Sequence, residues 1–425
     1  MSILVFLAGL FIAIAMGIPI ALALLVAGLA LMLQLDLLDA QIMAQNLMNG
    51  ADSYSLLAIP FFILAGEAMN AGGISRRIID LPMKLVGHRR GGLGYVAIIA
   101  AVLMASLSGS AAADTAALAM VLLPMMKQAG YPEGGSAGLI ATGGIIAPII
   151  PPSIPFIIFG ATTGVSISQL FLAGIAPGVM MGVALAFVWH WQSKRLDLTP
   201  MPKATRSEII GSVRSGIWAL MLPVIIIGGF RSGIFTPTEA GVVAAAYAFF
   251  IGIFIYRELK LPDIYEVLFS AAETTAIVML LVAAAAVSAW LITIADFPGQ
   301  VVALLAPVVD QPILLMALIM LVIMIIGMVM DLTPTVLILA PVLMPLVAAA
   351  GINPVYFGVM FILNCSIGLI TPPVGNVLNV IAGVSRLPFE RCAAGVLPYL
   401  MTMLALLALF VIFPALIITP LNWLR

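Results

Sequence analysis

Two aspartates, Asp114 and Asp331, stand inside long apolar stretches of this chain. If such a stretch lies in a membrane, an acidic side chain costs roughly 2.5–3.5 kcal/mol on insertion scales and needs a partner, a cation or a watery cavity. Small and hydroxyl-bearing residues flank both, in SLSGSAAADT and in GMVMDLTPT. We therefore take both carboxylates as candidate cation ligands. A helix N-cap, or a carboxylate at a solvated tip, stays open as the alternative for each.

Further oxygen donors accompany each aspartate. In the first half these are Ser106, Ser108, Gly109, Ser110, Gly143, Gly144, Ala147 and Pro148, and in the second half Gly327, Thr333, Asn364, Gly368 and Thr371. Glycine and proline interrupt helices there, and unwound backbone at membrane depth is tolerated only where it is buried in protein or lines a cavity. Broken-helix ends of this kind bind Na+ in several transporter folds. Ordinary helix packing through small residues remains the alternative for SLSGS taken alone.

Two proline pairs mark an internal repeat, because Pro151-Pro152 and Pro372-Pro373 stand 221 residues apart in closely similar segments. Proline lacks an N–H group, so each pair frees carbonyl groups one turn earlier, while helix N-termini beyond the break favour an anion. We therefore expect a small carboxylate substrate between the two half-sites. Its expected contacts are Pro151, Pro152, Pro372, Pro373 and Asn376.

The composition predicts the setting of these residues. Of 425 residues, 64% are hydrophobic and 8% are charged, against about 25% charged in soluble domains. Apolar runs of about twenty residues recur along the chain, which predicts an all-α polytopic membrane protein with about 10–11 transmembrane helices and two re-entrant hairpins. The net charge of −1 leaves no basic surface for nucleic acid. No nucleophile–base pair, phosphate loop or metal-cluster spacing is present, so we expect neither an enzyme nor a cofactor.

The polar segments that separate the apolar runs predict the domain organisation. We expect a first repeat over 1–191, a cytoplasmic linker over 192–215 and a second repeat over 216–425. Each repeat would hold one hairpin and one broken helix, placed at 93–127, 137–165, 313–349 and 356–383. The run 2–33 is long for one span and short for two, with Gly17-Ile18-Pro19 as a possible break.

Charge indicates how the repeats are oriented. Segment 74–92 contains five Lys or Arg residues and His88, whereas segment 295–311, its equivalent under the offset, has only Asp296 and Asp310 as charges. Cations prefer cytoplasmic connections, so the two segments should lie on opposite sides of the membrane, as in an inverted repeat. Segment 74–92 fits an amphipathic surface helix and a solvated basic loop equally well.

At four ordered motifs the chain resembles the large membrane subunit of tripartite ATP-independent periplasmic (TRAP) transporters. They are SLLAIPFFILAGEAMNAGG, SLSGS, GGIIAPIIPPSIPF and IGLITPPVGN. The likeness covers essentially the whole chain. Two details, NGADSYSLLAIPFF and MDLTPTVLILAPVLMPL, look most like members for 2,3-diketo-L-gulonate and related sugar acids.

The resemblance implies an elevator-type, Na+-coupled importer in the lipid of a bacterial inner membrane. A small four-helix membrane subunit, on a separate polypeptide, and a soluble periplasmic substrate-binding protein would be its partners. Carried over, the family's cation sites fall at Ser106, Ser108, Gly109, Gly144 and Ala147, and at Gly327, Thr333, Gly368 and Thr371, while Asp114 and Asp331 match acids needed for transport. The alternatives are a single-component Na+/dicarboxylate symporter and a channel or structural membrane subunit.

Overall fold

Helices make up the chain in the computed structural model, which describes residues 2–196 and 198–424, and no strand occurs in that part. The first half contains α1 (Ser2–Ala15), α2 (Ile20–Gln34), α3 (Ala40–Ala51), η1 (Tyr54–Leu57), α4 (Ala58–Ala71), α5 (Ile74–Val86), α6 (Gly92–Ser108), α7 (Ala111–Gln128), α8 (Glu133–Gly144), α9 (Ile154–Thr163) and α10 (Ile167–Ser193). The second contains α11 (Arg206–Arg231), α12 (Pro237–Phe250), η2 (Ile251–Ile255), α13 (Leu261–Ile294), α14 (Phe297–Val309), α15 (Pro312–Gly327), α16 (Leu332–Ala349), α17 (Pro354–Gly368), α18 (Asn376–Ser385), α19 (Phe389–Ile412) and α20 (Ala415–Leu424).

Seven helical segments in the described part are long and apolar enough to cross a membrane. They are Tyr54–Ala71, Ile167–Ser193, Arg206–Arg231, Pro237–Ile255, Leu261–Ile294, Leu332–Ala349 and Phe389–Ile412. Several of the remaining apolar helices are shorter, because glycine or proline ends them early. The helical structure and the seven spans confirm the predicted all-α membrane class, in which short helices form the hairpins and the broken helices.

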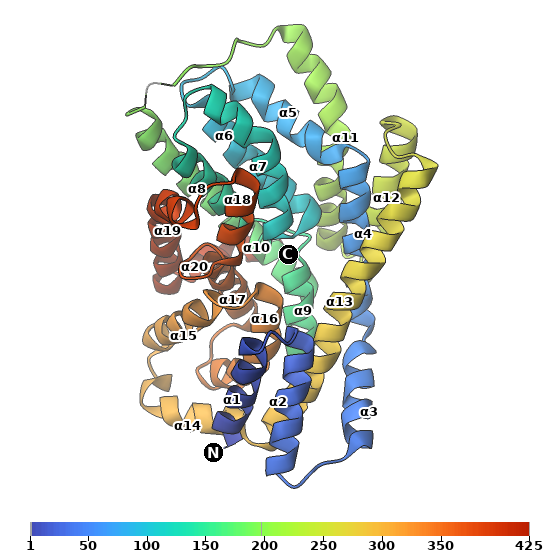
Figure 1. Cartoon of the computed structure of the whole chain (residues 1–425), viewed down its shortest axis with the longest axis vertical. Helices are drawn as coiled ribbons and strands as arrows, with labels where there is room; N and C mark the ends of the chain where they lie inside the picture. Colours follow the sequence, from blue (N-terminus) through green and yellow to red (C-terminus); the bar gives the residue numbers. More distant parts are fainter. Residues whose placement is uncertain (1, 197, 425) are drawn as a thin grey trace.

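The offset of 221 residues relates helices as well as motifs. Helices α7 and α16 are each 18 residues long and begin 221 positions apart, at Ala111 and Leu332. Helices α8 and α17 also begin 221 positions apart, at Glu133 and Pro354. The connecting helices α5 and α14, which are likewise equivalent, lie at opposite ends of the molecule (Figure 1). Equivalent elements at opposite ends are the arrangement of an inverted repeat.

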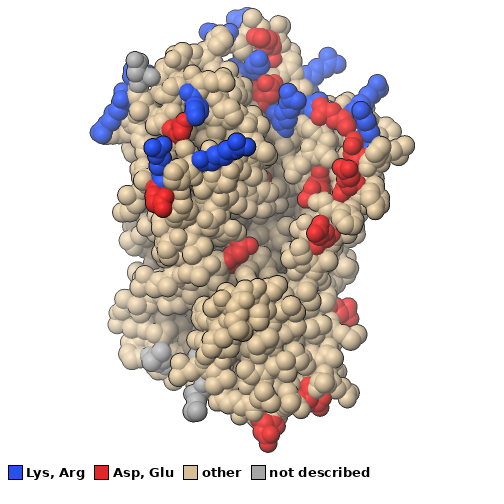
Figure 2. All heavy atoms as spheres, in the orientation of Figure 1, with Lys and Arg blue, Asp and Glu red and all other residues tan. Residues whose placement is uncertain are grey.

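Charge divides the two ends of the molecule. On the face drawn in Figure 2, Lys and Arg gather at the end that carries α5, whereas the end that carries α14 shows acidic side chains and no basic ones. The preference of Lys and Arg for cytoplasmic connections therefore places α5 on the cytoplasmic side.

The apolar run 2–33 folds as two helices that meet at residues 16–19. At 14 and 15 residues, α1 and α2 are each about 21–23 Å long, which is short for a hydrocarbon core of about 30 Å. The chain begins at the α14 end, and α2 returns to that end before α3 (Figure 1). The run therefore folds as a helical hairpin whose two ends both lie at the α14 end of the molecule.

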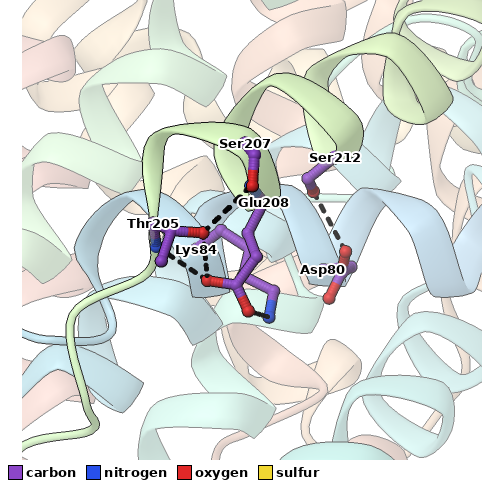
Figure 3. A network of polar contacts seen from close by, with 6 residues as sticks. All are labelled: Asp80, Lys84, Thr205, Ser207, Glu208 and Ser212. Atoms are coloured by element: carbon purple, nitrogen blue, oxygen red, sulfur yellow. Dashed lines mark hydrogen bonds and ion pairs between the residues drawn. The ribbon is translucent and has the colours of Figure 1, made fainter.

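Helix α5 is an amphipathic helix and not a loop. Ile74, Ile78, Ile79 and Leu81 are buried, although Leu85 on the same segment is exposed. Its polar side is tied to the start of α11, because Ser212 Oγ donates a hydrogen bond to Asp80 Oδ2 at 3.0 Å and Lys84 pairs with Glu208 at 3.8 Å (Figure 3). A second tie joins Arg77 to Glu258, just beyond η2, at 2.7 Å. Helix α5 is thus attached to α11 and to the segment that follows α12.

Candidate functional site

The first half-site is built where the tip of the α6–α7 hairpin contacts the break between α8 and α9. Gly109, at the tip, has φ +63°, and a Cβ there would lie 2.8 Å from the carbonyl oxygen of Pro152. Only a residue without a side chain permits both the left-handed backbone and this close approach. Helix α9 restarts at Ser153, whose Oγ accepts a hydrogen bond from Phe156 N at 3.3 Å and donates to Pro148 O at 2.6 Å.

Asp114 lies in the first turn of α7 and is 2% exposed. Ser108 Oγ donates a hydrogen bond to Asp114 Oδ1 at 2.5 Å, whereas Asp114 Oδ2 is buried without a hydrogen-bond partner. The N-cap of α7 is Ser110, whose Oγ accepts from Ala113 N at 3.4 Å. The N-cap alternative therefore does not apply to Asp114. A buried carboxylate with a free oxygen is costly unless a cation or a proton joins it.

Thr115, which the sequence reasoning missed, supplies a second orphan oxygen beside Asp114. Its Oγ1 is buried without a partner and lies against Gly144, at the end of α8. The signal available in the sequence was a hydroxyl adjacent to the aspartate, but the contact with Gly144 depends on packing. Of the other predicted donors, Ser106 donates from its Oγ to Leu103 O at 2.6 Å, and Gly143 packs against Ala101.

The second half-site repeats this contact with other side chains. The tip of the α15–α16 hairpin meets the break between α17 and α18, where Gly375 N donates to Met328 O at 3.1 Å. Gly327 and Gly368, the last residues of α15 and α17, touch backbone to backbone. Asn364 is fully buried, and its Nδ2 donates to Met320 O at 2.5 Å while its Oδ1 has no partner. Each half of the protein therefore contains a buried side-chain oxygen without a hydrogen-bond partner, Asp114 Oδ2 in the first half and Asn364 Oδ1 in the second.

Asp331 differs from Asp114 in its surroundings. It occupies the N-cap position of α16 but makes no capping hydrogen bond, and it is exposed. Asn376 Nδ2, at the start of α18, donates to Asp331 Oδ1 at 3.3 Å. Thr371 Oγ1 donates to Ile367 O at 2.8 Å. The carboxylate of Asp331 is therefore held at the mouth of the second break and not buried within it.

One cavity of about 270 Å³ joins the two half-sites. Its lining brings together Gly109, Ser110, Ala111, Ala112, Pro148, Ile154 and Pro155 from the first half with Asp331, Leu332, Thr333, Leu369, Asn376 and Val377 from the second, and Ile63, Thr274 and Val278 close it. Thr274 and Val278, on α13, are further residues that the sequence reasoning did not identify. The proline pairs themselves are not among the described lining residues, and Pro151 and Pro152 are buried.

The electrostatics of this cavity favour a cation. Among the described residues that line it, Asp331 is the one charged side chain. No group of three or more His, Cys, Asp or Glu side chains that could hold a metal occurs in the described part of the chain. A cation would therefore be bound mainly by carbonyl and hydroxyl oxygens with a single carboxylate nearby, a donor set that suits Na+. Figure 2 shows the molecule hollowed across its middle.

Two re-entrant hairpins facing two broken helices around a central cavity, in a membrane protein with inverted halves, form an architecture typical of membrane transporters. Residues 7–416 match the family model described as "Tripartite ATP-independent periplasmic transporter, DctM component". The chain belongs to this family of TRAP transporter large permeases. It is accordingly a multi-pass protein of the inner membrane and a transporter component, not an enzyme.

Known relatives match all or nearly all of the chain. It is 66% identical over 425 residues, covering all of both chains, to the 2,3-diketo-L-gulonate TRAP transporter large permease protein YiaN of Escherichia coli (strain K12). It is 39% identical to the sialic acid TRAP transporter large permease protein SiaM of Vibrio cholerae, over 94% of this chain and 93% of that protein. Among solved structures, the Alcanivorax borkumensis YdaH transporter shares the fold with a TM-score of 0.65 at 16% identity, covering 88% of this chain and 89% of the other.

Proposed function

We propose that this protein is the membrane-spanning permease of a Na+-driven importer for a hydroxylated organic acid. The observation that carries the proposal is the pair of orphan oxygens, Asp114 Oδ2 and Asn364 Oδ1, each buried where a hairpin packs against a broken helix. A site that leaves buried acceptors unpaired is incomplete by itself. One Na+ in each half-site would complete it.

The proposed cation donors follow the two contacts. In the first half they are Ser106, Ser108, Gly109, Ser110, Asp114, Gly143, Gly144, Ala147 and Pro148, joined now by Thr115. In the second they are Gly327, Asp331, Thr333, Asn364, Gly368 and Thr371. Sodium bound there would neutralise Asp114 and Asp331 and fix the hairpin tips. The cavity would then lie between two bound cations whose neighbouring carboxylates are neutralised, so that a substrate carboxylate is no longer repelled and needs no basic side chain.

The solute that we propose is 2,3-diketo-L-gulonate or a closely related sugar acid. The relative with 66% identity is named for 2,3-diketo-L-gulonate, and more distant relatives are named for sialic acid, C4-dicarboxylates and isethionate. All of these are anions. Asn376 and the Asp331 carboxylate, at 3.3 Å from one another, offer hydrogen bonds to substrate hydroxyl groups at the edge of the cavity.

Transport would proceed by an elevator movement. The two hairpins and two broken helices would slide as one core against α4, α11, α12 and α13. Support comes from the attachment of α5 to α11 through Asp80 and Ser212 and to the segment after α12 through Arg77 and Glu258. In this proposal the chain passes from the outer helices to the core in the segment between α5 and α6, where Gly91 has φ +70°.

Two partners complete the proposed system, a small four-helix membrane subunit and a soluble periplasmic binding protein. The family description is of a tripartite transporter. A relative from Oleidesulfovibrio alaskensis, the isethionate TRAP transporter permease protein DctMQ, is 36% identical to this chain, which covers 63% of its length. The additional length in that relative is where we place the counterpart of the small subunit.

Uptake by proteoliposomes tests the proposal. The permease is reconstituted with the small subunit, and radiolabelled 2,3-diketo-L-gulonate is added with its binding protein under an inward Na+ gradient. Uptake should need both the gradient and the binding protein. Uptake that persists without the binding protein would favour a single-component symporter, and flux without saturation would favour a channel.

A further inference from the structure

A second cavity, of about 440 Å³, lies beyond the central one toward the acidic end of the molecule. Helices α9, α13 and α16 each contribute residues to both cavities. Along α13 the lining passes from Thr274 and Val278 to Val282, along α16 from Thr333 to Leu337, and along α9 from Pro155 to Ala161. Four residues separate the two linings on α13 and on α16, which is about 6 Å or one helical turn. We call this second space the outer cavity.

The direction of these helices places the outer cavity on the periplasmic side. Helix α13 runs from the end that carries α5 to the end that carries α14 (Figure 1). Its outer-cavity residues, from Val282 to Thr293, therefore lie nearer the acidic end than Thr274 does. A solute that enters from the periplasm passes this level of the protein before it reaches the hairpin tips.

Three polar residues of the outer cavity's lining have side chains without a hydrogen-bond partner in the described part of the chain. They are Asn49 from α3, Ser53 from the turn before η1, and Trp290 from α13. Two threonines in the same lining are already satisfied, because Thr162 donates to Ile158 O and Thr293 to Ala289 O, both at 2.8 Å. An amide, a hydroxyl and an indole N–H thus remain free to bind a ligand.

The chemistry of this lining selects for hydroxyl groups and against charge. No Lys, Arg, Asp or Glu belongs to the described lining, and Asp52, which precedes Ser53, is exposed beside it. The nearby acid repels a carboxylate, while a neutral amide and hydroxyl donate and accept bonds to alcohol groups. The flat indole adds an apolar face for C–H groups with its N–H as a polar handle. The volume lies within the range of small-molecule sites, about 300–1,000 Å³.

We infer that the outer cavity is a second, periplasm-facing solute site, in which Asn49, Ser53 and Trp290 hold the hydroxylated end of the incoming acid. The carboxylate end then points toward the central cavity and its cations, one helical turn away. The site orients the solute before the hairpin tips receive it. This inference rests on the proposed function, because the ligand is the solute of the importer.

Two variants test these groups: Asn49→Leu removes the amide with little change of shape, and Trp290→Phe removes the indole N–H together with one ring. Their controls are Asn46→Leu, one turn earlier on α3, and Trp218→Phe, on α11, neither of which lines the cavity. The measurement is Na+-driven uptake of 2,3-diketo-L-gulonate against the concentration of loaded binding protein. Each test variant should raise the half-saturating concentration about fivefold, the cost of one neutral hydrogen bond. The maximum rate and both controls should stay within about twofold of the parent protein.

A side-specific readout separates this role from a purely structural one. With the solute supplied from the cytoplasmic side in counterflow, the half-saturating concentration should be unchanged in Trp290→Phe. Solute should also quench tryptophan fluorescence of the purified complex in the parent protein and less in Trp290→Phe. Unchanged external half-saturation with equal quenching in both proteins would overturn the outer site, and so would a cavity that retains co-purified lipid which solute does not displace. The proposed importer fails separately, if the parent protein shows no Na+-driven uptake.

Discussion

The contact between Gly327 and Gly368 offers a matched pair of substitutions with opposite expected outcomes. A Cβ on Gly368 would lie 2.6 Å from the carbonyl carbon of Gly327 and 2.8 Å from its oxygen, whereas a Cβ on Gly327 would meet nothing closer than 3.5 Å. Neither residue has a positive φ, so alanine suits the backbone of both. Gly368→Ala therefore wedges two backbones apart, and Gly327→Ala fits the existing space.

The magnitude follows from the distances. Ordinary contact begins at 3.4 Å, so Gly368→Ala must separate the hairpin from the broken helix by about 0.8 Å, the difference from the 2.6 Å contact. Overpacking of this kind costs about 1–3 kcal/mol, and each 1.4 kcal/mol is a factor of about ten in an equilibrium constant. The displaced atoms include the carbonyl oxygen that we propose as a cation donor. The Na+ concentration for half-maximal uptake should therefore rise about tenfold or more in Gly368→Ala and stay within about twofold in Gly327→Ala.

The assay is the initial rate of solute uptake into proteoliposomes over a range of Na+ concentrations. Equal amounts of folded protein are assured by size-exclusion profiles of each variant. If Gly368→Ala keeps the Na+ dependence of the parent protein, the second half-site does not bind the cation at this contact. Equal damage from Gly327→Ala would also refute the reasoning, because that change meets no close neighbour.

Three further outcomes are expected. Asp114→Asn keeps the side-chain shape and should reduce Na+-dependent uptake about tenfold or more, since the carboxylate is 2% exposed and unscreened; uptake equal to the parent would remove it from the site. Asp331→Asn should raise the half-saturating Na+ concentration by a smaller factor than Asp114→Asn does, because water screens this exposed carboxylate. A greater loss of Na+-dependent uptake in Asp331→Asn than in Asp114→Asn would contradict the geometry. Oxidative cross-linking of Asp80→Cys with Ser212→Cys should leave uptake intact if α5 stays with α11, and a block reversed by reductant would show that they separate.

Glycine and proline residues in the sequence are enough to locate the breaks between helices. Gly109, the proline pairs and Gly368 stop helices for reasons that act within a few residues, so the expected hairpins and broken helices fall where α6–α9 and α15–α18 end and restart. The direction of an apolar helix is not encoded in this way. The run 2–33 carries no charge to fix its course, and whether α1 and α2 cross the membrane depends on what they pack against.

The two aspartates show that the repeat does not predict which residues bind the cations. Under the offset Asp331 falls on Ser110 and Asp114 falls on Thr335. The structure gives this mismatch a physical meaning, because Asp114 is buried one turn inside α7 while Asp331 is exposed at the start of α16. The halves share their architecture but place their charges differently. The unpaired Thr115 hydroxyl and the α13 residues of the cavity depend on tertiary packing, which a single sequence does not reveal.

The Na+ dependence of uptake tests the central claim, that each half binds one cation, most directly. Initial rates are measured against Na+ concentration at constant ionic strength, with the membrane potential clamped. We predict a sigmoidal curve with a Hill coefficient above 1, and a simple hyperbola for variants that disable one half-site, such as Asp114→Asn. Uptake that is indifferent to Na+, or hyperbolic in the parent protein, would contradict the account.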